Sequence, residues 1–174
     1  CLGSMNLSFS RGDNLENVLE NYRRISRAIG FPVESIVTSD QTHTTNVRQV
    51  GKEDCGCGVL TPRTFHDIDG LITNEPGVTL ATFYADCVPL YFYDPTHKAI
   101  GLSHSGWRGT VGNIAKATVE AMQKAYHTDP ADLIAAIGPS ICQDCYEVSE
   151  DVIEQLRQAY PETLHKKLFY RKPN

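Results

Sequence analysis

The chain has 174 residues, of which 41% are hydrophobic and 21% charged, as is typical of a globular protein with one packed core. Its formal net charge of −5 excludes a broadly basic surface, so nucleic acid is not an expected partner. No apolar run approaches the ~20 residues of a membrane span, so we expect no membrane partner either. We therefore expect a single domain over residues 1–174.

The first predicted element is a helix over residues 15–29. Asp13 and Glu16 form a capping box before it, and Gly30 with Pro32 ends it. Its apolar face at helical spacing consists of Leu15, Val18, Leu19, Tyr22, Ile25 and Ile29. Short extended segments follow at 36–38 and 47–50, and a polar loop with several glycines runs from 51 to 67.

Four strands are predicted next, over residues 68–73, 78–84, 88–93 and 99–104, with turns at Glu75-Pro76-Gly77 and Asp94-Pro95-Thr96. A second amphipathic helix buries Val111, Ile114, Ala115, Thr118, Val119 and Met122, and Asp129-Pro130 ends it. A strand over 133–137 and a last helix, capped by Ser149 and burying Val152, Ile153 and Leu156, complete the order. This pattern predicts an α+β fold, with a mixed β-sheet core and helices packed on it.

The six cysteines indicate free thiols, because the chain is too long and too rich in apolar segments for a disulfide-stapled secreted scaffold. They are Cys1, Cys55, Cys57, Cys87, Cys142 and Cys145. Cys142 and Cys145 have CxxC spacing, but no second pair stands at zinc-finger distance and no thioredoxin-like pattern surrounds them. We expect a reduced, cytoplasmic protein.

His43, Cys87 and His104 each follow an apolar, β-prone segment, so each is expected at the edge of the sheet. Two imidazoles and one thiolate can form a three-ligand zinc site with one open position, and an open position distinguishes a catalytic zinc from a structural one. Asp86 is a candidate partner for a ligating imidazole or a base for a zinc-bound water. A buried cysteine can also be only a small hydrophobe, and a lone histidine only a satisfied core residue.

Seven motifs occur in an order that closely resembles the YfiH family, which includes the bacterial YlmD-like proteins and has carried the label multicopper polyphenol oxidase laccase. They are residues 1–8, the 12–23 segment, Gln41-Thr42-His43, Asp67-Ile68-Asp69-Gly70-Leu71-Ile72-Thr73, Ala85-Asp86-Cys87-Val88-Pro89, His104-Ser105-Gly106-Trp107-Arg108-Gly109, and Gly138-Pro139-Ser140-Ile141 with Tyr146-Glu147-Val148. The resemblance implies a YfiH/CNF1-like layered sandwich. The family extends beyond both ends of this chain, so residues that complete the site are expected outside it.

The resemblance also implies a zinc-containing enzyme that cleaves adenosine, inosine, guanosine and methylthioadenosine by phosphorolysis and deaminates adenosine. The family's metal ligands fall on His43, Cys87 and His104. The expected partners are therefore a purine nucleoside and phosphate, with the protein a monomer or a homodimer. Copper is not the expected native metal, because multicopper oxidases need many His-x-His pairs and this chain has six histidines and no such pair.

Six residues are candidates for acting on the substrate. Asp86 and His43 are the predicted catalytic residues, and Arg108 or Arg23 would hold phosphate through paired hydrogen bonds. Arg23 is the nearest substitute for the arginine of the family's first helix. Tyr84 and Trp107 could stack on the base, although a lone tryptophan beside glycines is often a packing residue. Arg108 could equally pair with a structural carboxylate.

Two other functions use the same residues. One is an amide hydrolase with Cys87 as nucleophile and His104 as base. For such a hydrolase the family resemblance implies cysteine- or metal-dependent editing of peptidoglycan precursors (UDP-MurNAc-amino acid). Metal dependence distinguishes it, because a thiol nucleophile does not need an ion. The other is a non-catalytic binding domain with a structural zinc, in which Cys142 or Cys145 would fill the fourth position.

Overall fold

Five strands form the main sheet, in the order β2-β3-β6-β5-β7, in the computed structural model, which describes residues 4–172. The strands are β2 (Val47–Gln49), β3 (Gly70–Thr73), β5 (Val88–Asp94), β6 (Ala99–Ser105) and β7 (Ile134–Ile137). β2 and β3 are parallel and the other neighbours are antiparallel, so the sheet is mixed. β1 (Ile36–Thr38) and β4 (Thr79–Ala81) pair in parallel as a separate small sheet. The predicted α+β class is confirmed.

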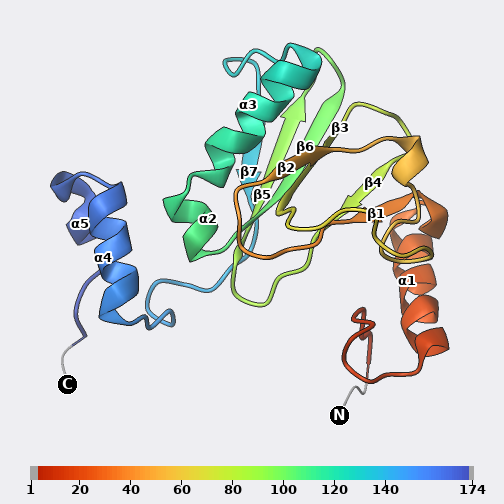
Figure 1. The fold of residues 1–174 in the computed structure, drawn as a ribbon, viewed down its shortest axis with the longest axis horizontal. Coiled ribbons are helices and arrows are strands. Elements are labelled where there is room, and N and C mark those ends of the chain that lie inside the picture. The colour runs from red at the N-terminus through yellow and green to blue at the C-terminus, as the bar shows by residue number, and fades with distance from the viewer. Residues whose placement is uncertain (1–3, 173–174) are drawn as a thin grey trace.

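Five α-helices surround the strands: α1 (Leu15–Ile29), α2 (Trp107–Val111), α3 (Ile114–Tyr126), α4 (Glu150–Ala159) and α5 (Glu162–Leu168). In Figure 1, α3 lies along one face of the main sheet, α1 lies beside the small sheet, and α4 with α5 lies at the far side from α1. Within residues 4–172, no helix combines the length and the apolar character needed to cross a bilayer. α1 and α3 each pack against strands.

The core consists of three apolar clusters, because neighbouring strand residues face opposite sides of the sheet. Ile72 and Phe92 pack against Met122 of α3 on one face. Leu71, the neighbour of Ile72, packs on the other face against residues that include Val37 of the small sheet. The third cluster joins α1 to β1 and consists of Val18, Tyr22, Ile36 and Val59. α1 and α3 are thus each held by a separate apolar cluster that includes strand side chains.

The predicted buried face of α1 is partly wrong. Leu15 is 59% exposed and Ile29 is 70% exposed, whereas Asn21 and Ser26 are buried. The helix is rotated toward the N-terminal segment, because the Asn21 side chain donates to the Asn6 carbonyl and Tyr22 donates to the Leu7 carbonyl. The cap is also one residue later than predicted, since the Asn14 side chain accepts from the Glu16 amide.

The predicted second helix is in fact two helices, and a short helix near the C-terminal end was not predicted. The break falls at Gly112 and Asn113, where Asn113 adopts a left-handed backbone with φ of 61° and accepts from the Lys116 amide through its side chain. α5 buries none of its residues fully, so it carries no apolar period by which it could be recognised.

Strand β4 is shorter than the predicted 78–84 segment, because beyond its end the backbone hydrogen-bonds to a side chain instead of to a neighbouring strand. The Gln41 amide nitrogen donates to the Phe83 carbonyl, and its oxygen accepts from the Phe83 amide, both over 2.7 Å. Gln41 therefore pairs with the backbone as a neighbouring strand would. This contact fixes the path of the loop that leads to Cys87.

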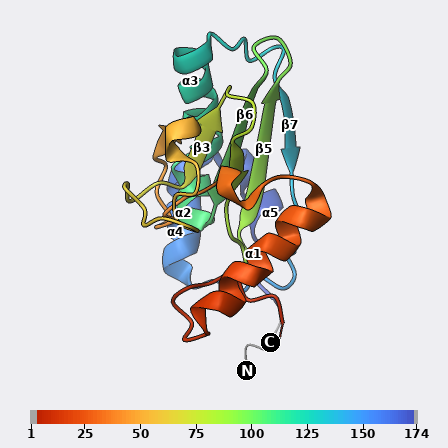
Figure 2. The ribbon, with the colours of Figure 1, turned by 90° about the vertical axis from the view of Figure 1, so that its right-hand side faces the viewer.

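Part of the main sheet has an exposed apolar face. Phe92 packs under α3, so its neighbours Tyr91 and Tyr93 point to the opposite side, where they are 46% and 43% exposed. Their strand partners include Ile100 of β6 and Ile134 of β7, which are exposed as well. Figure 2 shows β7 at the outer edge of this side of the sheet. We call these four side chains the open face.

Candidate metal centre

The structure brings His43, Cys87 and His104 together, as the sequence predicted. Their donor atoms all lie within 4.8 Å of one another, and the distance from Cys87 Sγ to His43 Nε2 is 4.0 Å. His43 lies in the loop between β1 and β2, Cys87 directly precedes β5, and His104 is near the end of β6. The pairing of Val88 with Ser105 in the β5–β6 hairpin places Cys87 beside the end of β6.

The donor set fits a zinc ion. Nitrogen and sulfur ligands sit about 2.0–2.3 Å from zinc, so two of them around one tetrahedral ion are about 3.5 Å apart, close to the separations found here. Burial raises the pKa of the Cys87 thiol, and the nearby carboxylates of Asp86 and Asp69 raise it further. The free thiol is therefore protonated near neutral pH, and a metal ion would take the place of that proton.

A buried carboxylate that sequence reasoning did not assign supports the two imidazoles. Asp69 is fully buried, and its Oδ1 lies 2.8 Å from His104 Nδ1. The same carboxylate accepts from the backbone amides of residues 42, 43 and 44. Asp69 belongs to one of the family-like motifs, but its contacts join segments far apart in the sequence, which no local pattern reveals.

Gly106 explains how the three donors come so close together. A Cβ atom at this position would lie 2.6 Å from His43 Cδ2 and 3.2 Å from Cys87 Sγ. Its φ of −72° is ordinary for any residue, so the need for glycine is one of space and not of backbone conformation. Gly106 directly precedes α2, in the segment that contains His104.

Tyr84 lies against the site, with its ring centroid 5.6 Å from that of His104. Its hydroxyl donates to the Ser103 carbonyl and lies 2.5 Å from the Thr82 hydroxyl. Burial raises the pKa of Tyr84 to about 12, so the phenol stays neutral. In this structure the Tyr84 ring packs against the ring of the candidate metal ligand His104. Its predicted stacking on a substrate base stays a prediction.

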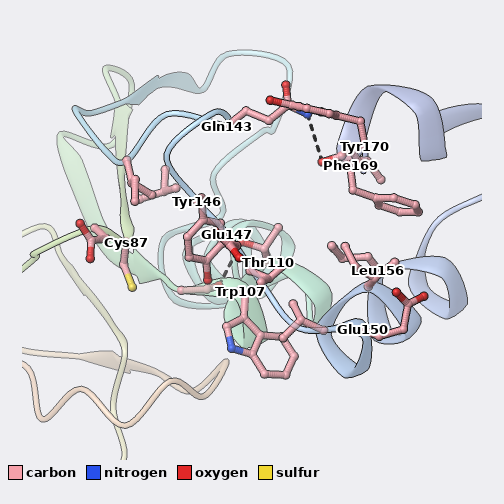
Figure 3. Close-up of a pocket in the computed structure, with 18 of the residues that line it drawn as sticks. Cys87, Trp107, Thr110, Gln143, Tyr146, Glu147, Glu150, Leu156, Phe169 and Tyr170 are labelled. Atoms are coloured by element: carbon pink, nitrogen blue, oxygen red, sulfur yellow. Dashed lines mark hydrogen bonds between the residues drawn. The ribbon is translucent and has the colours of Figure 1, made fainter. Parts of the chain in front are cut away.

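A cavity of about 590 Å³ opens beside Cys87. Figure 3 shows Tyr146 and Trp107 between Cys87 on one side and Leu156 with Phe169 on the other. Asp86 also lines the cavity, together with Glu147 of the family-like Tyr146-Glu147-Val148 motif. The volume is in the range of small-molecule sites, and the lining combines aromatic rings with a few carboxylates.

The structure separates the two predicted arginines. The Arg108 guanidinium is stacked 4.3 Å from the centre of the Trp107 ring, so it lies next to a residue that lines the cavity. Arg23 lies on α1, where it approaches Glu16 and Glu20 at 3.9 and 4.0 Å, and it does not line this cavity. Of the two predicted arginines, Arg108 lies near the cavity and Arg23 does not.

Asp86 lies at the cavity wall, and a different carboxylate bonds to a ligating imidazole. Its backbone carbonyl accepts from the Ile141 amide, and its side chain lies at the cavity wall. Within residues 4–172, the carboxylate that bonds to a ligating imidazole is Asp69. Asp69 takes the contact with His104, and the predicted roles of Asp86 stay predictions.

Neither Cys142 nor Cys145 belongs to the donor group formed by His43, Cys87 and His104. Both are exposed free thiols, as the cysteines at 55, 57 and 87 are free, while Cys1 lies outside the described residues. Within the described part of the chain, one group of three His, Cys, Asp or Glu donors is close enough to hold an ion. A multicopper centre needs several such groups.

Comparison with known proteins gives consistent relatives. The model of the family described as "Multi-copper polyphenol oxidoreductase laccase" matches residues 1–172. The purine nucleoside phosphorylase YlmD of Geobacillus stearothermophilus is 41% identical over 159 residues, covering 91% of this chain and 58% of that protein. Adenosine deaminase RL5, from an unknown prokaryotic organism, is 35% identical over 158 residues, covering 90% of this chain and 60% of that protein.

A solved structure agrees. The crystal structure of the Bacillus licheniformis hypothetical protein YfiH superimposes with a TM-score of 0.85 at 34% identity, covering 94% of this chain and 61% of that one. The fold and the donor group therefore define an α+β protein with a candidate His₂Cys metal centre. The chain belongs to the multi-copper polyphenol oxidoreductase laccase family, the YfiH family, and spans about three fifths of the length of the two curated relatives above.

Proposed function

We propose that this chain carries the zinc site and part of the substrate pocket of a purine nucleoside phosphorylase that also deaminates adenosine. Two observations support the proposal: the convergence of two imidazoles and one thiol beside a cavity, and relatives named for these two activities. The proposed substrates are adenosine, inosine, guanosine and methylthioadenosine. The free thiols of the described cysteines suit a reduced, cytoplasmic protein.

The proposed ligands are His43, Cys87 and His104. When bound there, zinc would supply Lewis-acid chemistry and lower the pKa of a coordinated water toward about 7. A protein ligand set of three leaves room for a reactant, in contrast to the four protein ligands of a structural site. This fits the absence of Cys142 and Cys145 from the group and argues against a purely structural zinc.

In the proposed deamination, water adds to C6 of adenosine and ammonia leaves, which yields inosine. Asp86, at the cavity wall, would accept a proton from the water and pass it to the departing amino group. In the proposed phosphorolysis, a phosphate oxygen bonds to C1′ of the ribose as the bond to purine N9 breaks. Arg108, beside Trp107, would hold the phosphate through paired hydrogen bonds.

The alternative of a cysteine nucleophile has less support. A nucleophilic thiol needs a lowered pKa, whereas burial and two neighbouring carboxylates raise the pKa of Cys87. The ring nitrogen in contact with its sulfur belongs to His43 and not to the predicted base His104. The same surroundings suit a thiolate that is stabilised only when a cation is bound.

The test is incubation of the zinc-loaded protein with adenosine and phosphate, followed by chromatography of the products. We expect adenine, ribose 1-phosphate and inosine, and at least about 100-fold less of each with the Cys87→Ser variant. Cys145→Ser, which removes an exposed thiol outside the donor group, is the matched control and should keep full activity. Absence of all three products from the loaded protein would reject the proposal, and activity that survives a strong chelator would favour the cysteine hydrolase.

A further inference from the structure

We infer that Asp69 is a positioning residue that holds two of the three donors, His43 and His104, in one arrangement. The inference rests on the proposed metal site, but it concerns a residue to which neither the sequence motifs nor the named relatives assign a role. It is carried by a set of hydrogen bonds that converge on one buried carboxylate.

The first half of the set fixes His43. Asp69 Oδ1 accepts from the His43 amide over 3.1 Å, and Oδ2 accepts from the Thr42 and Thr44 amides over 3.1 and 2.7 Å. Three successive amides that point at one anion form a nest, which usually binds a phosphate or another external anion. Here the anion is a side chain of the protein itself. The nest requires His43 to adopt a left-handed backbone, with φ of 66°, that side chains with a Cβ normally avoid.

The second half of the set fixes His104. Its Nδ1 lies 2.8 Å from Asp69 Oδ1, and its backbone amide donates to the Asp69 carbonyl over 2.7 Å. Because a carboxylate can only accept, Nδ1 must carry the proton, and the lone pair is then on Nε2. Asp69, which directly precedes β3, therefore determines the ring tautomer of His104 and the backbone conformation of His43.

All the groups that bond to the Asp69 carboxylate are hydrogen-bond donors, as an ionised carboxylate requires. No lysine or arginine is bonded to Asp69 among the described residues, and its partners are three backbone amides, the Thr44 hydroxyl and one imidazole. A carboxylate that only held the loop in place would need the backbone amides alone. The additional bond to His104 Nδ1 links Asp69 to the metal-donor group.

The experiment compares Asp69→Asn with a matched control, Asp94→Asn. Asp94 is also buried and also accepts from two successive backbone donors and a histidine Nδ1, but at the other end of β5, where its partners are Thr96 and His97. Zinc affinity of each folded variant is measured by competition with a chromophoric chelator. We expect Asp69→Asn to bind zinc 10–100-fold more weakly than wild type, as is typical when a ligand's carboxylate partner is removed, and Asp94→Asn to bind like wild type.

The expected loss has a specific cause. If the asparagine amide nitrogen faces His104 Nδ1, it donates a hydrogen bond, so Nδ1 must be unprotonated. The ring proton is then on Nε2, which no longer has a free lone pair with which to bind a metal ion. If it faces the loop instead, it meets backbone donors that it cannot accept from. Wild-type affinity in Asp69→Asn, or an equal loss in Asp94→Asn, would overturn the inference. Unchanged affinity in Cys87→Ala would instead reject the metal site itself, and the inference with it.

A measurement on the unmodified protein covers the case in which Asp69→Asn does not fold. Long-range proton–nitrogen correlation spectra of the ¹⁵N-histidine-labelled, metal-free protein at alkaline pH report which ring nitrogen of each histidine carries the proton. We expect His104 to be protonated on Nδ1. Protonation on Nε2 would contradict the role of Asp69.

Discussion

Single atoms decide how closely the three donors approach one another, and Gly106 shows this most directly. A methyl group at this position would overlap the His43 ring and contact the Cys87 sulfur. Gly106→Ala should therefore weaken zinc binding by at least about tenfold while the fold stays intact, because the backbone conformation suits alanine. Isothermal titration calorimetry with Zn²⁺ measures the effect.

Gly109→Ala is the control for that substitution. Its added Cβ would have only ordinary contacts, the nearest at 3.4 Å to Ile114, and it lies on α2, the short helix that Gly106 directly precedes. It should bind zinc like wild type. Equal affinity in both variants would show that the space beside Gly106 is not needed by the ion.

At the same scale, Asp94 predicts how stability depends on pH. The neighbouring Thr128 hydroxyl, together with the backbone amide and the ring of His97, lowers the pKa of Asp94 below its usual value, in spite of desolvation. A carboxyl whose pKa is lower in the folded state stabilises the fold above its unfolded pKa of about 4, and this contribution is lost as the pH falls below that value. Asp94→Asn should therefore be less stable than wild type at pH 7, and the difference should shrink toward pH 3.

Urea unfolding followed by circular dichroism at several pH values checks this prediction. Asp132→Asn, an exposed aspartate on the loop before β7, serves as the control and should change little at any pH. A stability difference for Asp94→Asn that stayed constant from pH 7 to pH 3 would contradict the assigned cause.

At the scale of the elements, the packing of α3 on the sheet depends on Met122. Met122 is fully buried between α3 and the sheet, where it contacts the cluster that contains Ile72 and Phe92. Met122→Ala should lower the free energy of unfolding by about 2–5 kcal/mol, because it removes apolar contacts and leaves a cavity. Gln123→Ala, one position further on the exposed side, should change it by less than about 0.5 kcal/mol. Denaturant unfolding of both variants measures the difference.

The elements also show what can be predicted from sequence and what cannot. The helix over 15–29 and the strands were predictable, because their apolar period is local. The rotation of α1 was not, since it depends on bonds from Asn21 and Tyr22 to a segment about fifteen residues away. The donors His43, Cys87 and His104 were predicted from residue type and family resemblance, whereas Asp69 and Gly106 act through contacts that exist only after folding.

For the molecule as a whole, the open face has consequences that can be measured. Tyr91 and Tyr93 are nearly half exposed beside Ile100 and Ile134, so this 174-residue chain should bind the dye ANS. The double substitution Tyr91→Lys with Tyr93→Lys should reduce the dye fluorescence and change the thermal midpoint little.

The residue between the two tyrosines gives the contrast. Phe92 faces α3 and is buried, so Phe92→Ala should cost about 3–5 kcal/mol of stability. If the lysine pair destabilised the chain as strongly as Phe92→Ala, the open face would be part of the packed interior and the assignment of the two sides of β5 would be wrong.

The wide spacing of the three donors along the chain also determines when an ion can be captured during synthesis. A ribosome extends a chain by roughly 5–20 residues per second, and His104 leaves the tunnel about sixty residues after His43. For several seconds the nascent polypeptide therefore presents an incomplete set of donors. If the proposed site takes up an ion, loading would consequently be a late event, open to competition from whichever cation the cell supplies at that moment.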